Sequence, residues 1–171
     1  MKKKHVSNFN AMRISFDLDE VLFVSPKTHK TEAELRFPFK YIYKERLRLG
    51  TPALIHELQE RGFSIWVYTS SFRSEKYIKR LFRHYGVFFD GIINGERHLK
   101  EVQGSRGETA PSKLPTRYNI SLHIDDENSV IANGRSHGFA VFQLDAPDDE
   151  WVPKIIAEAE DIRKKRELNR G

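Results

Sequence analysis

The chain has 171 residues, of which 39% are hydrophobic and 31% are charged, and its formal net charge is +5. This length and composition are ordinary for one soluble domain with a core of its own. The absence of cysteine excludes disulfide bonds and thiolate metal sites, and it fits a cytoplasmic location. No apolar run is long enough to cross a bilayer, so no membrane partner is expected.

The first predicted strand covers residues 12–18 and follows a basic N-terminal tail, residues 1–11. No apolar segment follows the lysines of the tail, so the pattern does not indicate a signal peptide. The strand ends in Asp17 and Asp19, two residues apart, which places both carboxylates on the same side of an extended chain. Taken alone, such a pair is also typical of a solvated turn.

Residues 23–49 form an irregular insert, or flap, after this strand. Within it, an aromatic side chain occupies every second position from Phe37 to Tyr43. This period predicts an extended strand or hairpin with one aromatic face. Two interpretations stay open. The rings pack on the protein's own helices, or residues 37–43 form a self-association surface or a platform beside the site.

Strands and helices alternate through the rest of the chain. This alternation predicts right-handed crossovers and a parallel sheet with helices on both faces, an α/β Rossmann-like three-layer fold in a single domain over residues 12–168. Residues 94–118 are predicted to be a loop. The other predicted elements are a helix from Thr51, a strand over 63–69, a helix over 74–85, a strand within 87–93, a strand over 120–124, a helix over 127–136, a strand over 139–144 and a helix over 148–165.

Three of the predicted strands end in acidic or hydroxyl side chains. Ligands of an open parallel sheet bind at the carboxyl ends of its strands, so we expect these side chains to meet there. Carboxylate oxygens suit a hard cation, and a carboxylate can also attack phosphorus to form an acyl phosphate. The sequence therefore predicts a site for a cation and a phosphoryl group. The side chains are those of Asp17, Asp19, Thr69, Ser70, Asp125 and Asp126.

The residues around these strand ends resemble three motifs of the haloacid dehalogenase (HAD) superfamily of phosphohydrolases. Residues 16–22 resemble the first motif, residues 67–70 the second and residues 124–126 the fourth. The resemblance covers about residues 12–145 and implies a HAD-like fold. Because the segments 23–49 and 94–118 are too short for a further domain, it implies the small uncapped type without a separate cap domain.

The resemblance implies a magnesium-dependent phosphatase that hydrolyses a phosphomonoester through an aspartyl phosphate. Asp17 would be the nucleophile and a magnesium ligand. Asp19 would be the general acid/base and bind Mg²⁺ through its backbone carbonyl. Thr69 would hydrogen-bond the phosphoryl oxygens, helped by the backbone N–H of Ser70. The phosphorylated substrate is not identified.

The same resemblance implies two further acids and a lysine at the site. Asp126 would hold Mg²⁺ directly or through water, and Asp125 would support the metal shell or the lysine. Lys113 is the candidate for the family lysine, which binds phosphate and offsets the charge of the nucleophile, although it lies closer to Asp125 than is usual in the family. Lys100 is the alternative, and either lysine could instead be a solvated loop residue.

Other functions and roles remain open from the sequence. A non-catalytic phosphate- or partner-binding module on the same fold is the main alternative, but the presence of both Asp17 and Asp19 favours catalysis. A nucleic-acid-end phosphatase rests only on basic charge and an uncapped site. His123 is expected to be a packed residue, and Arg73 either a surface charge or a phosphate contact.

Overall fold

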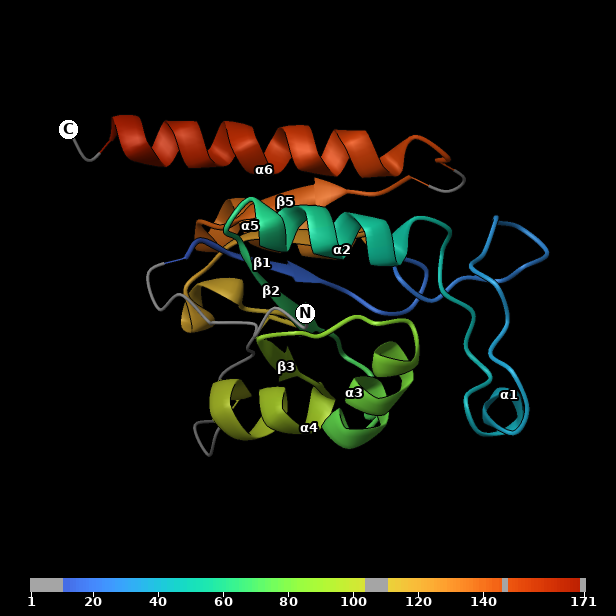
Figure 1. Cartoon of the computed structure of the whole chain (residues 1–171). Coiled ribbons are helices and arrows are strands. Elements are labelled where there is room, and N and C mark those ends of the chain that lie inside the picture. The colour runs from blue at the N-terminus through green and yellow to red at the C-terminus, as the bar shows by residue number, and fades with distance from the viewer. Residues whose placement is uncertain (1–10, 104–110, 146–147, 170–171) are drawn as a thin grey trace.

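Five parallel strands form the central sheet, in the order β3-β2-β1-β4-β5 (Figure 1). The protein is seen in a computed structural model, which describes residues 11–103, 111–145 and 148–169; the predicted tail lies almost wholly outside these ranges. The strand order places β1, which leads to Asp17, between two hydrogen-bonded neighbours. The strands are β1 (Arg13–Phe16), β2 (Ser64–Tyr68), β3 (Gly91–Ile93), β4 (Ile120–Asp125) and β5 (Ala140–Gln143).

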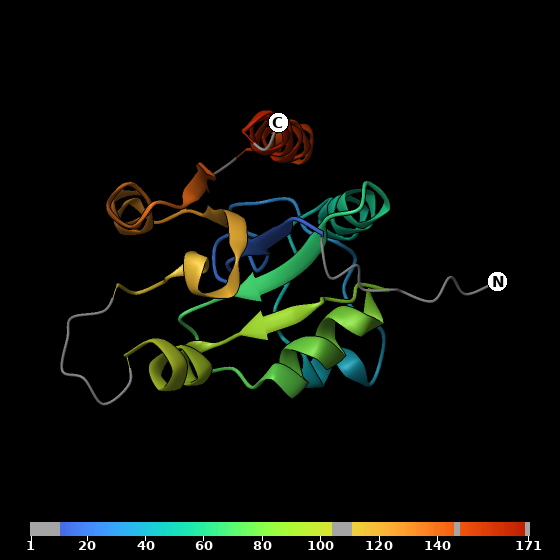
Figure 2. The same ribbon diagram turned by 90° about the vertical axis from the view of Figure 1, so that its left-hand side faces the viewer.

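Helices cover both faces of the sheet (Figure 2). The helices α2 (Thr51–Glu60), α3 (Glu75–His84) and α6 (Trp151–Leu168) lie on one face, and α5 (Asn128–His137) lies on the other. This is the predicted α/β Rossmann-like three-layer fold, and the described residues contain no separate cap domain. The shorter elements are α1 (Phe39–Ile42), α4 (Gly95–His98), the π-helical turn η1 (Leu99–Gln103) and the 3-10 turn η2 (Pro115–Tyr118).

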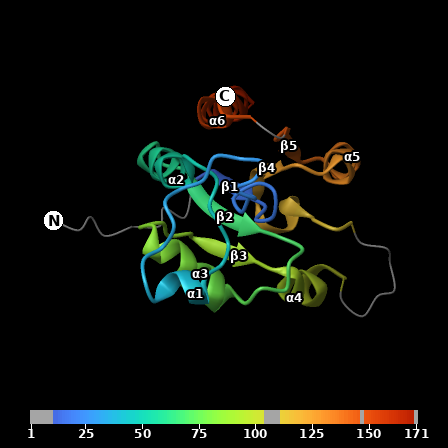
Figure 3. The same cartoon turned by 90° about the vertical axis from the view of Figure 1, so that its right-hand side faces the viewer.

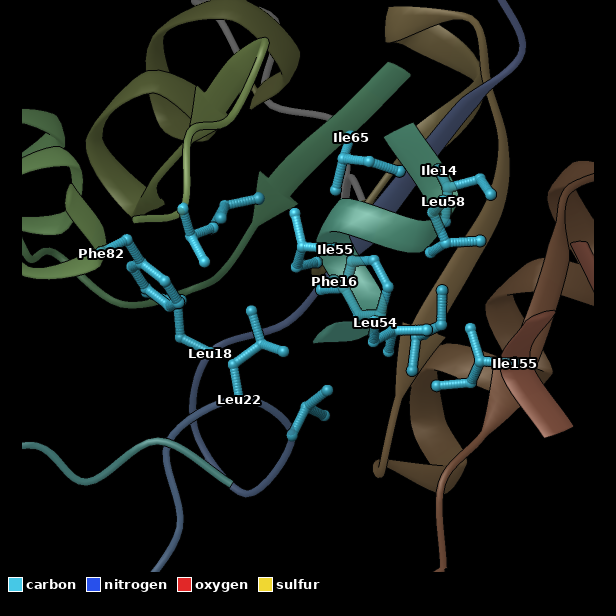
Figure 4. Packing of buried hydrophobic residues seen from close by; sticks show 14 of the residues in the cluster. Ile14, Phe16, Leu18, Leu22, Leu54, Ile55, Leu58, Ile65, Phe82 and Ile155 are labelled. Atoms are coloured by element: carbon cyan, nitrogen blue, oxygen red, sulfur yellow. The ribbon is translucent and has the colours of Figure 1, made fainter. Parts of the chain in front are cut away.

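One face of the sheet carries the main hydrophobic core (Figure 4). Side chains alternate between the two faces of a strand, so Ile14 and Phe16 of β1 point to the same side. They are fully buried with Leu54 and Leu58 of α2. Burying an aliphatic or aromatic side chain of this size contributes roughly 1.5–3 kcal/mol. This core fixes β1 and therefore the position of the residue that follows it.

The opposite face of the central strands is more polar. Ser15 of β1 is paired in register with His123 of β4, and both side chains are fully buried. Tyr68 of β2 lies on the same side, with its ring centroid 5.8 Å from that of His123. These polar side chains lead directly toward the carboxyl ends of the strands.

Residues 37–43 do not form the predicted strand. They form the single helical turn α1, in which the Tyr43 N–H donates to the Phe39 carbonyl (2.9 Å). Because of this turn the aromatic side chains do not share one face: Tyr43 is buried, whereas Phe37 is 78% exposed and Tyr41 is 67% exposed. The period of two misled the prediction because an isolated helical turn is too short to show a period of its own.

Residues 94–118 are not a plain loop either. In their described part they contain α4, η1 and η2. The side chain of Asn94 accepts a hydrogen bond from the Arg97 N–H (3.0 Å) and caps the first of these helices. The loop was predicted from its glycine, proline and charged residues, and this criterion overlooks Asn94 as a helix N-cap. None of the helices in the described part of the chain is both long and apolar enough to span a membrane.

Packing of α6 against the core can be tested by shortening one of two adjacent side chains. Ile155 is fully buried, whereas its neighbour Ile156 is only partly buried. We expect Ile155→Ala to lower the free energy of unfolding by about 2–5 kcal/mol, because it leaves a cavity. Ile156→Ala serves as the matched control and should cost less. Urea unfolding measures both, and an equal loss would contradict the packing of α6 seen here.

Candidate active site

Three neighbouring strands end in buried polar side chains at the carboxyl end of the sheet. Figure 3 views the sheet from this end. Asp17 follows β1, Thr69 follows β2 and Asp125 is the last residue of β4, and each side chain is almost fully buried. The Asp17 N–H still donates to the Ile124 carbonyl (3.0 Å), and the Thr69 N–H to the Ile93 carbonyl (2.9 Å). The ladder of the sheet therefore holds these residues in place.

A buried lysine bridges two of the carboxylates. Lys113 Nζ lies 2.6 Å from Asp17 Oδ2 and 2.5 Å from Asp125 Oδ2, and the side chain is only 2% exposed. The other carboxylate oxygens accept backbone hydrogen bonds, Asp17 Oδ1 from Leu18 (2.7 Å) and Asp125 Oδ1 from Glu127 (2.9 Å). The structure thus brings Lys113 to the expected acids.

The alternative lysine lies elsewhere. Lys100 is exposed on the π-helical turn η1, whereas Lys113 precedes η2 and points into the site. Burial alone would lower the pKa of Lys113, but the charges of Asp17 and Asp125 outweigh this effect and raise it. The ammonium group therefore stays charged inside the site.

The acids carry more negative charge than one ammonium group can balance. Burial raises the pKa of Asp17, even though Lys113 lowers it, and the nearby charge of Asp125 raises it further. Burial would also raise the pKa of Asp125, but the hydrogen bond from His123 and the charge of Lys113 lower it to about 2. Asp126 has a raised pKa, through burial and then the charges of Asp125 and Asp17.

Asp17, Asp125 and Asp126 together could hold a metal ion. Each offers a carboxylate oxygen, and these three oxygens lie within 4.8 Å of one another. Hard oxygen ligands and a small number of protein groups suit Mg²⁺, which keeps several of its waters. A divalent cation would also balance the surplus negative charge. The donor set therefore fits magnesium.

Asp19 is not one of these three acids, and its side chain forms an ion pair with Arg73 instead. Its side chain is 53% exposed, and its Oδ2 accepts a hydrogen bond from Arg73 Nη1 (2.8 Å). Arg73 Nε also donates to Glu45 Oε1 (3.0 Å), and the Tyr77 hydroxyl donates to Glu45. Arg73 is therefore no isolated surface charge, since it joins the segment 23–49 to Asp19.

The predicted phosphate contacts of the second strand differ in exposure. Thr69 is 1% exposed and its Oγ1 accepts a hydrogen bond from the Ser71 N–H (3.1 Å), whereas Ser70 is exposed. The hydroxyl of Thr69 thus shapes the turn that follows β2.

Sequence reasoning missed the tyrosine that positions the lysine. The Leu114 N–H donates to Tyr68 Oη (2.8 Å), and this hydroxyl lies 2.6 Å from His98 Nδ1. Burial raises the pKa of Tyr68, so its hydroxyl stays a hydrogen-bond donor. Lys113 is thereby fixed to the end of β2. A polar ring closing an apolar strand was the available signal.

A second group that the sequence did not assign to the site supports Asp125. His123 Nε2 lies 2.8 Å from Asp125 Oδ2, and His123 Nδ1 lies 2.8 Å from Ser15 Oγ. His123 is packed, as predicted, but it also holds a site carboxylate. The period of two along β4 puts residues 123 and 125 on one face and could have revealed this contact.

Two solved structures with a similar fold are described as HAD-type hydrolases. A HAD-superfamily hydrolase of subfamily IA from Geobacter sulfurreducens PCA matches with a TM-score of 0.51 and 14% identity, over 80% of this chain and 92% of that chain. A predicted HAD-like family hydrolase from Porphyromonas gingivalis matches with a TM-score of 0.50 and 16% identity, over 87% and 98%. No family model and no curated protein matches the chain. The chain thus has the HAD-superfamily fold.

The bridging lysine makes a testable contribution. Lys113→Ala would leave two buried carboxylates facing each other without a cation, and breaking a buried ion pair costs about 3–5 kcal/mol. We expect a loss of this size in urea unfolding at neutral pH. Lys100→Ala is the matched control and should change the stability little, because its side chain is exposed. A larger loss of unfolding free energy in Lys100→Ala than in Lys113→Ala would contradict the assignment of Lys113 as the bridging lysine.

Proposed function

We propose that the protein is a magnesium-dependent phosphatase that hydrolyses a phosphomonoester through an aspartyl phosphate on Asp17. The buried lysine bridge carries the proposal: Lys113 Nζ lies 2.6 Å from Asp17 and 2.5 Å from Asp125 at the carboxyl end of the sheet. A buried cation beside a nucleophilic carboxylate suits chemistry in which negative charge develops. The HAD-superfamily hydrolases of the same fold support a hydrolytic reaction.

The residues of the chain have distinct roles in the proposed reaction. A carboxylate oxygen of Asp17 attacks phosphorus, and the bond from phosphorus to the leaving oxygen breaks. For this step Asp19 must be protonated and released from Arg73; it then gives its proton to the leaving oxygen, and the alcohol departs. Asp19 then takes a proton from water as it attacks the acyl phosphate, which releases inorganic phosphate and restores Asp17. Lys113 and Thr69 bind the phosphoryl oxygens throughout.

Asp17, Asp125 and Asp126 would hold the magnesium ion, joined by the backbone carbonyl of Asp19. The ion would supply positive charge that reduces the repulsion between these carboxylates and an anionic substrate. Lys113 and His123 keep Asp125 in place for this task, since both contact its Oδ2. The leaving group is unrestricted by a cap domain in the described residues, which favours large or varied substrates.

Substitution of the two aspartates of the first motif separates their roles. Asp17→Asn should abolish hydrolysis of an aryl phosphate, because the nucleophile is lost. Asp19→Asn should lower the rate by about a hundred- to ten-thousandfold, the usual cost of losing a general acid/base. Asp161→Asn on α6 is the control. Normal turnover by Asp17→Asn would exclude the aspartyl phosphate, and inactivity of the wild type would favour a non-catalytic binding module.

Metal binding can be measured without turnover. Mg²⁺ that binds only the folded protein should raise the melting temperature, with a stabilisation of about 2.7 kcal/mol at a concentration one hundred times the Kd. The Asp126→Asn variant should lose most of this shift, and Asp161→Asn should keep it. Chelation should abolish hydrolysis by the wild type. An unchanged melting temperature with undiminished activity in chelator would refute magnesium dependence.

A further inference from the structure

Exposed aromatic rings gather beside the site, on the segment that follows β1. The aromatic–basic surface comprises residues 36–44, which include α1, together with the exposed basic side chains of α3. Phe37 is 78% exposed and Tyr41 is 67% exposed. Apolar side chains that gather in one exposed place mark an interaction surface.

This surface is fixed to the body of the protein. The ring centroids of Tyr43 and Tyr77 lie 5.2 Å apart, and those of Phe39 and His84 lie 4.1 Å apart. Both contacts join the segment to α3. The exposed rings of Phe37 and Tyr41 therefore stand on a packed support and keep their positions.

The charge of this surface is mainly basic. Residues 36–44 contain arginine and lysine but no acidic residue, and Lys40 Nζ lies 5.2 Å from the centre of the Tyr41 ring. On α3 the one acidic residue, Glu75, is paired with Lys79. The exposed basic side chains of the surface are Arg36, Lys44, Lys76, Lys79, Arg80 and Arg83.

The surface is linked to the proposed active site through the residue that follows it, Glu45. Figure 1 places α1 beyond the end of β1 from which Asp17 follows, and Figure 3 shows α1 close to α3. Glu45, directly after residues 36–44, accepts a hydrogen bond from Arg73 (3.0 Å), which in turn binds Asp19. Phe72, between the second motif and α3, is 67% exposed. Two hydrogen bonds, through Glu45 and Arg73, thus link the surface to Asp19 of the proposed site.

We infer that the aromatic–basic surface binds single-stranded nucleic acid and delivers its terminal phosphate to Asp17, an inference that rests on the proposed phosphatase function. Exposed rings stack on bases, and basic side chains contact the phosphates between them. A sugar phosphate carries a single phosphate, whereas an oligonucleotide offers bases to the rings and several phosphates to the basic side chains. Self-association through residues 37–43 is disfavoured because it would bring like charges together.

Binding can be tested apart from catalysis. Fluorescence anisotropy in the Asp17→Asn background would compare single-stranded 12-residue DNA and RNA oligonucleotides with a 5′-phosphate, a 3′-phosphate or neither. Adding Phe37→Ser and Tyr41→Ser should weaken binding by roughly tenfold or more through lost stacking. Adding Arg80→Ala and Arg83→Ala should weaken it and reduce its dependence on salt. Leu168→Ser and Lys164→Ala, on exposed positions of α6, are the matched controls.

Turnover provides the second measurement. In the otherwise wild-type protein, Phe37→Ser with Tyr41→Ser should lower kcat/KM for the phosphorylated oligonucleotide about tenfold more than for an aryl phosphate. Equal losses, or oligonucleotide binding that the substitutions leave unchanged, would overturn the surface while leaving the phosphatase proposal intact. Inactivity on every phosphate would refute the phosphatase, and with it delivery to Asp17, while the anisotropy still decides binding. A fall in oligomer mass without weaker oligonucleotide binding would make the surface a self-association interface and overturn the inference.

Discussion

The buried Lys113 ammonium group between Asp17 and Asp125 is the constraint on which the site depends. Two carboxylates removed from water repel each other, and removing either charge from water is costly unless it is paired. The strands bring the two carboxylates together, and the positive charge of Lys113 offsets the repulsion between them. Everything that positions Lys113 therefore also determines how closely Asp17 and Asp125 can lie.

The central features of the fold could be predicted from sequence because their signals are local and strong. Short apolar runs that alternate with amphipathic helical segments predicted the parallel sheet. The acids at the strand ends indicated which end of the sheet carries the site. The structure places Asp17, Asp125 and Asp126 together, as the motif order implied. The position of Lys113 was less secure in the sequence, since a lysine in a proline-containing loop looks the same whether it is buried or solvated.

The features that sequence reasoning missed depend on contacts between distant residues. No local pattern states that Arg73 pairs with both Asp19 and Glu45, because these residues come from three separate segments. The aromatic spacing in residues 37–43 matched a strand by coincidence, whereas in the structure Tyr43 is buried and its ring packs against that of Tyr77. Tertiary packing overrides local propensity most easily in short segments such as α1.

The Tyr68 hydroxyl has a consequence for how this chain can change in length. It contacts His98 near the start of the segment 94–118 and Leu114 near its end, so both points are tied to the tip of β2. Doubling the length of a flexible connection between tied points costs only about 0.6 kcal/mol of closure entropy. By this measure an insertion between these two points would cost little as long as both contacts to Tyr68 remain. A longer segment held at both ends by this tyrosine would change access to the site while the buried charge pairing stays intact.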